Sequence, residues 1–221
     1  IMKGSKFNLM HNKILFIIVC LNAFFTEAQT SMEAKMLLEN VSKQIESYNN
    51  IKFEFNYVLN NRKEQINQES KGEITVAGDL YKLDFLEATQ LFDGKSLYTI
   101  IPENEEITIT TSEEGDDFGI NPTKLLYFYK EGYDYQWDIT QQIEGKKIQF
   151  IKLIPIEEDA EILSILIGIE VSKKHIFRII EVGINGTYTT LTINEMQVNF
   201  PLLKDYFVFD KKKYPDYYIN D

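Results

Sequence analysis

The sequence has very few residues of the types that supply nucleophiles and common metal ligands. It contains one cysteine, Cys20, and two histidines, His11 and His175. Cys20 and His11 precede the part of the chain that we expect to fold, which leaves His175, predicted to lie in a solvated turn. Disulfide frameworks, thiol nucleophiles, Ser-His-Asp triads and the common zinc sites therefore lack their parts.

Glycine is sparse and never clustered. Gly72, Gly78 and Gly94 stand singly between strand-like runs, so the sequence has no Gly-rich phosphate-binding loop and gives nucleotide binding no support. Adjacent acids such as Glu157 and Glu158 fall in predicted loops, where carboxylates usually face solvent rather than each other across a substrate. We therefore expect neither an enzyme, including one that acts on envelope polymers, nor a bound cofactor.

Positive charge is also in short supply. Lysine and arginine number 23 against 34 aspartates and glutamates, and the formal net charge is -11. Nucleic acids and anionic membrane surfaces attract clustered cations, so the sequence predicts neither as a partner. The acidic run from Ser112 to Asp117 lacks the alternate-position oxygens and closing glutamate of a calcium loop, so a solvated loop is the preferred interpretation over a calcium site.

The N-terminal residues have the layout of a secretory signal peptide. Three lysines precede an apolar run from Ile14 to Phe25, and Ala28 supplies the small residue of a cleavage site. The run of about a dozen residues is shorter than the roughly 20 that a spanning helix needs. We expect residues 1–28 to be removed near Ala28 and the protein to be exported to the periplasm.

The chain that would remain, residues 29–221, has a length suited to one domain. Roughly 190 residues can bury a sizeable core but are too few for two ordinary domains. Lipid attachment at Cys20 would require a small residue before it, and Val19 stands there. We therefore expect a single domain that is not lipidated, and a monomer.

The stretch from Gly72 to Thr110 predicts a β-meander. Three turn signals, Ala77-Gly78-Asp79, Asp93-Gly94 and Pro102 to Asn104, cut it into four runs of alternating apolar residues. Asp-Gly between such runs is the strongest short-range hairpin signal. Before the meander, Ile51 to Leu59 alternates strictly, which predicts an antiparallel strand with one apolar and one wet face.

Two helices are expected to cover the apolar face. Thr30 and Glu33 have the spacing of a capping box, and apolar residues follow at helical spacing as far as Tyr48, which predicts a helix of about 18 residues. Asn121-Pro122 predicts the start of a short, strongly apolar helix that ends at Gly132 and would act as a plug or lid.

Strand-like runs resume at Tyr133 and continue to a last expected strand at Phe207 to Phe209. Short strands with turn signals about every dozen residues indicate a barrel or sandwich rather than a parallel sheet. The total is about eleven strands, and an antiparallel sheet of that size curls.

Aromatic residues are abundant, with 15 phenylalanines and 13 tyrosines. Strands favour aromatic side chains, so a solid core is the simplest interpretation of the composition. The alternative is that part of this aromatic surface lines a cavity for an apolar ligand.

The order of these elements and several short phrases resemble the periplasmic lipoprotein carrier family LolA. No single phrase is specific, and the resemblance depends on the ordered set, which runs over nearly the whole chain after the signal peptide. The phrases are Gly72-Glu73-Ile74-Thr75-Val76, Asp93-Gly94-Lys95-Ser96-Leu97-Tyr98, Pro102, Asn121-Pro122-Thr123-Lys124-Leu125-Leu126, Leu153-Ile154-Pro155 and Phe207-Val208-Phe209.

The resemblance implies a mainly β fold, an unclosed antiparallel β-barrel of about eleven strands covered by an N-terminal helix and a short central helix. It also implies a chaperone-like carrier that binds lipoprotein acyl chains in a hydrophobic cavity and shuttles them from the inner to the outer membrane. Its partners would be acylated lipoproteins or lipid, an inner-membrane lipoprotein-releasing transporter and an outer-membrane acceptor. The alternative function is a lipid- or lipoprotein-sensing regulatory module with the same half-barrel.

One position departs from the family pattern. Family members with a defined lid carry a basic residue in the turn between two core strands, where it bonds to the lid backbone. This sequence has Ala77-Gly78-Asp79 there. We therefore expect a lid held by apolar contacts alone.

The candidate acyl-binding residues come from the expected inner face of the strands and from the two helices. For each of them plain core packing is the alternative interpretation. They are Phe53, Phe55, Tyr57, Tyr81, Leu83 and Phe85 from the strands, with Leu38, Val41, Leu125, Leu126 and Phe128 from the helices.

Overall fold

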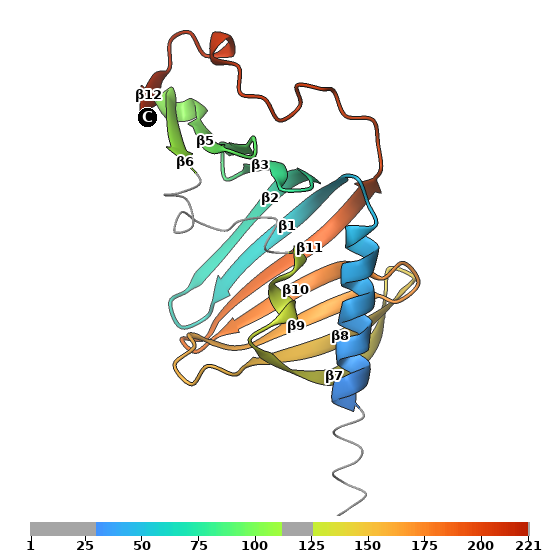
Figure 1. The fold of residues 1–221 in the computed structure, drawn as a ribbon. Helices are drawn as coiled ribbons and strands as arrows, with labels where there is room; N and C mark the ends of the chain where they lie inside the picture. The colour runs from blue at the N-terminus through green and yellow to red at the C-terminus, as the bar shows by residue number, and fades with distance from the viewer. Residues whose placement is uncertain (1–29, 112–125, 221) are drawn as a thin grey trace, which may run out of the picture.

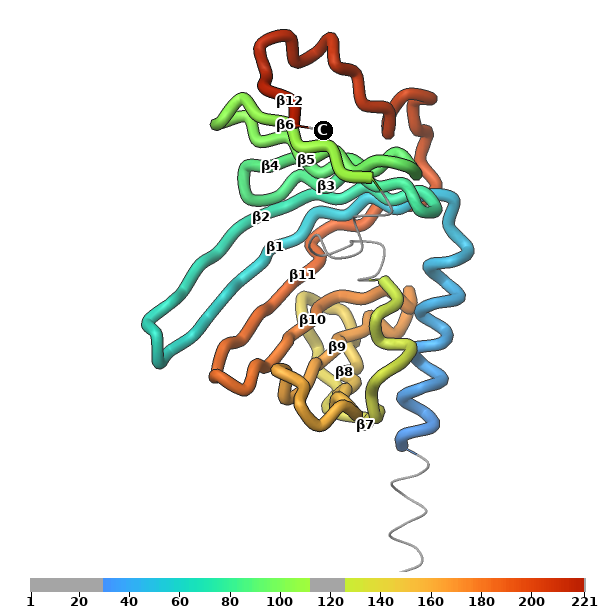
Figure 2. Tube along the Cα trace, turned by 60° about the vertical axis from the view of Figure 1, so that its left-hand side comes forward, coloured from blue at the N-terminus to red at the C-terminus, as the bar shows by residue number. Residues whose placement is uncertain are grey.

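The computed structural model describes residues 30–111 and 126–220. Twelve strands form one sheet, and a helix at residues 30–46 lies against it. The sheet curls without closing, and the helix runs along its open side (Figures 1 and 2). The predicted mainly β, unclosed antiparallel fold with an N-terminal helix is confirmed, with twelve strands in place of about eleven.

The strands are numbered in chain order. They are β1 (Ile51–Asn61), β2 (Ile66–Ala77), β3 (Leu80–Phe85), β4 (Ala88–Phe92), β5 (Ser96–Ile101), β6 (Glu106–Thr111), β7 (Tyr133–Ile143), β8 (Lys146–Pro155), β9 (Ile162–Glu170), β10 (His175–Gly183), β11 (Thr187–Val198) and β12 (Tyr218–Asn220). Short 3-10 helices lie between some of them: η1 (Pro102–Asn104), η4 (Phe128–Lys130) and η5 (Lys211–Lys213).

The pairing of β1 with β11 joins the two halves of the sheet. The strand order is β12-β6-β5-β4-β3-β2-β1-β11-β10-β9-β8-β7, so each half is a run of antiparallel hairpins. Register between β1 and β11 extends from Ile51 opposite Val198 to Asn61 opposite Thr187, with a shift after Glu54. β12 pairs in parallel with β6 at one edge, and β7 forms the other edge.

The meander contains one turn that the sequence does not signal. The chain reverses at Leu86 and Glu87, which splits the run before Asp93 into β3 and β4. Both residues have left-handed backbone, with φ of 51° and 62°. Glycine or asparagine usually fills such positions, and neither is present. β2 begins at Ile66, before the start of the predicted meander at Gly72, and continues through Gly72 to Ala77.

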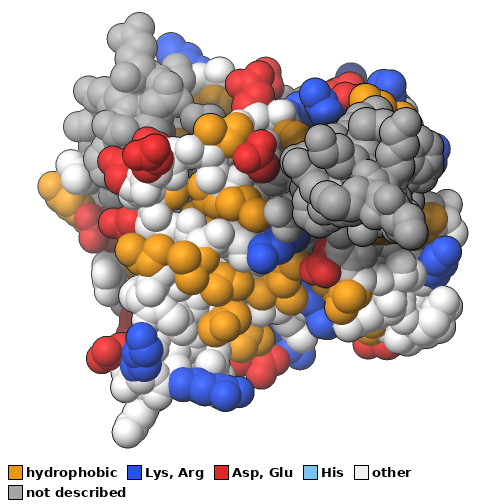
Figure 3. All heavy atoms as spheres, turned by 90° about the horizontal axis from the view of Figure 1, so that it is seen from below, with side chains coloured by type: hydrophobic (Ala, Val, Ile, Leu, Met, Phe, Trp, Pro, Cys, Tyr) orange, Lys and Arg blue, Asp and Glu red, His pale blue; other side chains and the backbone are white. Residues whose placement is uncertain are grey.

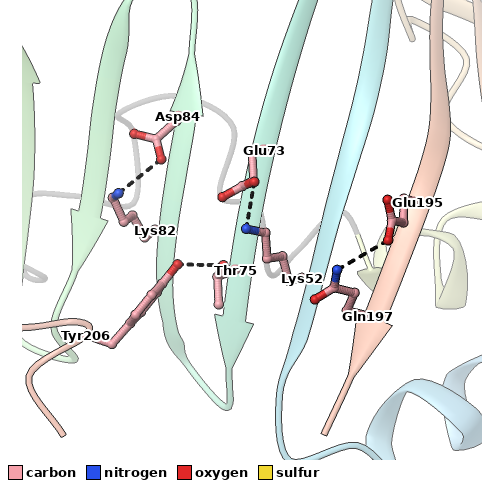
Figure 4. A network of polar contacts seen from close by, with 8 residues as sticks. All are labelled: Lys52, Glu73, Thr75, Lys82, Asp84, Glu195, Gln197 and Tyr206. Carbon is pink, nitrogen blue, oxygen red and sulfur yellow. Dashed lines mark hydrogen bonds and ion pairs between the residues drawn. The ribbon is translucent and has the colours of Figure 1, made fainter. Parts of the chain in front are cut away.

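The two faces of the sheet around β1 have opposite chemistry, as the alternation predicts. Phe53 is buried in the main core, whereas its neighbour Lys52 points outward and pairs with Glu73, Nζ to Oε2 2.8 Å. Lys82 pairs with Asp84 at 3.1 Å on the same outer face (Figure 4). Such exposed pairs stabilise a fold by at most about 1 kcal/mol, so their main effect is to keep this face polar.

The main core lies between the concave face of the sheet and the helix. The buried helical stripe is the predicted one, and burial of each large apolar side chain contributes about 1.5–3 kcal/mol. On the helix it comprises Ala34, Leu38, Val41 and Ile45, which face buried residues of β8 and β9, namely Ile151, Leu153, Ile165, Ile167 and Ile169.

The predicted central helix lies partly outside the described residues, at 121–125, and its described part is not α-helical. It contains η4, a single 3-10 turn. Tyr127, Phe128 and Tyr129 all contact the main core. Three consecutive α-helical residues would point about 100° apart, so one helix could not place all of them on the core. Figure 1 shows this segment beside the N-terminal helix.

Strands β8 to β10 are apolar on both faces. A second buried cluster, Ile148, Phe150 and Phe177, lies on the face away from the main core. Gly168 leaves room for it, because a Cβ there would lie 2.8 Å from Cε1 of Phe150. Seen from below, hydrophobic side chains form bands between charged and polar ones on the surface of the molecule (Figure 3).

The prediction of a strand at Phe207 to Phe209 is wrong. This segment crosses the outer face of the first half of the sheet, where every strand beneath already has two neighbours and none can accept another. It packs through side chains instead, with the Tyr206 hydroxyl 3.0 Å from Thr75 Oγ1 (Figure 4) and Phe209 stacked on Tyr98 at 4.3 Å between ring centroids. The tail then supplies β12, which the sequence analysis missed.

His175 also differs from the expectation of a solvated turn residue. It begins β10, is half-buried, and its Nε2 lies 2.7 Å from the hydroxyl of Tyr48, just beyond the N-terminal helix. Gln44 donates to the same hydroxyl at 2.8 Å, so the Tyr48 hydroxyl joins the side chains of Gln44 and His175. Burial lowers the pKa of His175 below its ordinary value of 6.5, and nearby Lys173 acts in the same direction.

We expect the free energy of unfolding to fall as the pH is lowered from about 8 to about 5. The unfolded chain takes up a proton at His175 near the ordinary pKa of 6.5, whereas the folded protein takes it up only at lower pH. The unfolded state thus binds more protons in this window, so stability is present above it and is lost as the pH falls. Urea unfolding at a series of pH values measures the effect.

The variant His175→Gln isolates this contribution. Its stability should depend less steeply on pH below about 6.5. Tyr48→Phe serves as the control, since it removes the hydrogen bond but leaves the imidazole buried and should retain most of the slope. Equal slopes for wild type and His175→Gln would contradict the assignment.

Candidate functional site

An apolar groove opens on the concave face where five strands converge. Because β1 lies between β2 and β11, inward-facing residues at alternate positions of these strands and of β3 and β10 meet in one place. Its volume is about 160 Å³. The lining residues are Phe53, Phe55, Tyr57, Ile74, Leu83, Phe85, Ile179, Glu181, Thr189 and Leu191.

Aromatic rings form one wall of the groove. Phe85 lies 5.4 Å from both Phe55 and Tyr57 between ring centroids, in tilted and edge-to-face geometries that aromatic pairs favour. The Phe55 ring lies over Gly72, its partner on β2, and a Cβ on Gly72 would overlap that ring. The shape of this wall therefore depends on the missing side chain at Gly72.

The structure brings five of the eleven candidate residues together in the groove: Phe53, Phe55, Tyr57, Leu83 and Phe85. The others are elsewhere. Tyr81 stacks on Phe92 at 5.7 Å and is buried, Leu38, Val41 and Leu126 belong to the main core, Phe128 lines a different cavity, and Leu125 lies outside the described residues.

The sequence analysis missed the residues that the second half of the chain contributes. Ile179 and Leu191 face each other across β10 and β11, and Leu191 faces Tyr57 across β11 and β1. Both strands were expected, and their alternation separates the two faces. The missing information was that β11 pairs with β1.

A second, larger cavity of about 1050 Å³ lies at the end of the groove. It is formed by the start of β7, the β8–β9 connection and the β10–β11 hairpin, and the charged side chains that line it within residues 30–111 and 126–220 are all glutamates. The lining residues are Phe128, Glu131, Gly132, Tyr133, Pro155, Ile156, Glu157, Ala160, Glu161, Ile162, Glu181, Gly183, Ile184, Asn185 and Thr187.

Burial changes the titration of groups around these cavities. It raises the pKa of Glu181, and it raises the pKa of Tyr133, to which the negative charge of Glu181 adds. Burial also raises the pKa of Tyr129 to about 12, although the hydrogen bond from Ser42 opposes the shift. Tyr129 is therefore un-ionised at neutral pH and acts as a hydrogen-bonding anchor.

The expectation that apolar contacts alone hold the central segment is wrong for its described part. The Tyr129 hydroxyl lies 3.0 Å from Ser42 Oγ on the N-terminal helix, and Lys130 pairs with Glu46 at 2.8 Å. The hydroxyl of Tyr135 donates to the carbonyl of Tyr129 at 2.8 Å. These bonds come from positions other than the turn at Ala77-Gly78-Asp79, which carries no basic residue.

Residues 30–111 and 126–220 contain neither a candidate metal site nor a candidate membrane-spanning helix. No three histidine, cysteine, aspartate or glutamate side chains in these ranges are placed to hold a metal ion. Within the same ranges, no helix combines the length and the apolar character needed to span a bilayer.

No protein-family model matches the sequence, and no curated protein matches it significantly. Solved structures do resemble it. An uncharacterized conserved protein from Thermus thermophilus has a TM-score of 0.54 at 11% identity, with 85% of this chain and 98% of that chain covered. This likeness shows the fold alone.

Other similar structures carry descriptive names. An outer membrane lipoprotein-sorting protein domain from Vibrio parahaemolyticus has a TM-score of 0.45 at 10% identity, covering 80% of this chain and 97% of that chain. A LolA superfamily protein from Nitrosomonas europaea has a TM-score of 0.41 at 11% identity, covering 80% and 97%. The similar solved structures thus include proteins described as a lipoprotein-sorting domain and a LolA superfamily protein.

We expect Gly72→Ala to destabilise the fold by about 1–3 kcal/mol, since the new methyl group would displace the Phe55 ring. Gly168→Ala is the matched control, because it displaces Phe150 on the opposite face by the same mechanism. Urea unfolding should show a loss for both variants. Crystal structures should show a narrowed groove only for Gly72→Ala, and an unchanged groove in that variant would contradict the assigned contact.

Proposed function

We propose that this protein is a non-enzymatic binding protein of the periplasm that holds an acyl chain of a lipid or lipoprotein in the groove between β1, β3, β10 and β11. The observation that carries the proposal is the groove itself. Eight of the ten described lining residues are aromatic or aliphatic, and Glu181 at one end is the only acidic or basic residue among these ten. A concave, mainly apolar site with few polar groups is the usual form of a small-ligand site.

The size of the groove limits what it holds. Ligand pockets commonly have about 300–1,000 Å³, and the groove has about 160 Å³. In this form it would accept one segment of one chain rather than several chains. Longer or multiple chains would require the wall of partly buried side chains, such as Leu83, Phe85 and Leu191, to move apart.

The transport role extends this proposal. The expected signal peptide and the resemblance to LolA support a carrier that receives lipoproteins from an inner-membrane transporter and delivers them to an outer-membrane acceptor. Such a carrier must bind its cargo reversibly. A partly buried groove suits reversible binding, because the part of the apolar wall that is already covered when the groove is empty adds nothing to the area that a ligand newly buries.

The groove is tested by a pair of variants at neighbouring positions of β10. Ile179 lines the groove and Ile180 packs against the second cluster on the other face, and both side chains are partly buried. We expect Ile179→Gln to weaken binding of the neutral fluorescent probe N-phenylnaphthylamine about 10-fold, or about 1.4 kcal/mol. Ile180→Gln should cost similar stability but leave binding unchanged.

Fluorescence titration and urea unfolding of both variants give the comparison. Equal loss of binding in the two variants, or no binding by the wild type, would overturn the proposal. Transfer of a fluorescent fatty acid from loaded protein to acceptor vesicles then separates a carrier from a sensing module. A carrier should release its ligand to vesicles, whereas a sensor need only bind it.

A further inference from the structure

Glu181 stands where the apolar groove meets the larger cavity. It is the one residue that lines both. Its carboxylate makes no hydrogen bond or ion pair with any residue in 30–111 or 126–220, although the side chain is half-buried. A partly buried acid without a partner is costly when ionised, which agrees with its raised pKa.

The two cavities are neighbours along one face of the β10–β11 hairpin. Gly183 and Thr187 line the larger cavity, Ile179 and Leu191 line the groove, and Glu181 lies between them opposite Thr189. These positions alternate along both strands, so they share one face of the sheet. The larger cavity therefore forms a charged end and the groove an apolar end, which is the arrangement of polar and apolar parts in an amphiphilic ligand.

The larger cavity, which forms the polar end, carries negative charge from its described residues. In the part of the chain that the structure describes, Glu131, Glu157, Glu161 and Glu181 line the larger cavity, and no lysine, arginine or histidine of that part does. Lys63, which lies near Gly186 at the tip of the hairpin, lines neither cavity. An anionic head group would meet repulsion here, whereas a cation would give the Glu181 carboxylate a charged partner.

We propose that the ligand is an amphiphile with a protonated amine in its head group, which lies against Glu181 while its apolar chain occupies the groove. The inference rests on the proposed function and adds the class of head group. A protonated amine has two sources that fit, an amine-bearing lipid head group and a lysine side chain next to an acylated residue.

The test compares ligands that share a twelve-carbon chain and differ in head group. Dodecylammonium and dodecyl sulfate below their critical micelle concentrations, and dodecanol below its solubility limit, displace N-phenylnaphthylamine from the protein at about pH 8, where carboxylates are ionised. We expect dodecylammonium to bind about 10-fold more tightly than dodecanol, and dodecyl sulfate more weakly than dodecanol. A second arm compares lauroyl-Ser-Lys-Lys amide with lauroyl-Ser-Glu-Glu amide, and the arm with the larger preference identifies the source of the amine.

Glu181→Gln should abolish the preference for the cationic ligands while leaving dodecanol binding unchanged. Glu158→Gln is the control for net charge, because Glu158 is exposed, neighbours Glu157 in the chain and lines neither cavity. It should retain the preference.

The outcomes separate this inference from the proposed function. Failure of the wild type to bind the neutral probe would overturn the proposed function. Normal probe binding without a cationic preference in either arm, or the same loss in Glu158→Gln as in Glu181→Gln, would overturn only the role of Glu181.

Discussion

The pairing of β1 with β11 is the constraint on which the rest of the structure depends. It joins residues as far apart in the chain as Ile51 and Val198, and it is the only pairing that links the two hairpin runs within the described sheet. Closing so long a loop costs conformational entropy before its contacts can form. Once formed, the pairing creates a continuous concave face, on which Tyr57, Leu191 and Ile179 lie side by side on three neighbouring strands. Without this pairing each half would have one wall of a groove and no ligand site.

The same constraint explains how much of the site the sequence could predict. The contributions of β1 and β3 follow from local alternation, so Phe53, Phe55 and Phe85 were identified as inward-facing without knowledge of the fold. Ile179 and Leu191 depend on which strand lies beside which, and alternation alone does not give that. Tyr81 shows that local alternation can also predict a lining residue that the groove does not contain. It shares the inner face of β3 with Phe85, yet it lies near the opposite end of the strand, where it stacks on Phe92 and does not line the groove.

The errors in secondary structure have similar physical causes. The turn at Leu86 and Glu87 has positive φ without glycine, so short-range chemistry could not signal it. The segment at Phe207 to Phe209 has strand-like residues but no free strand edge to join, and its aromatic side chains cover the outer face. That face needs a cover, because Leu91, Ile100 and Ile107 point outward from β4 to β6 and are nonetheless buried. The C-terminal segment supplies it, through a contact that local sequence does not specify.

The dimensions of the groove make the acidic end important for recognition. Burial of about eight methylene groups would contribute about 6 kcal/mol, at 0.8 kcal/mol for each. Association alone costs at least about 4 kcal/mol, so an apolar segment of that length binds weakly and with little selectivity among chains. Selectivity must then come from the part of the ligand that extends beyond the groove. In this protein that part would enter a cavity whose described charged groups are all carboxylates, with Glu181 at the point where the chain ends and the head group begins.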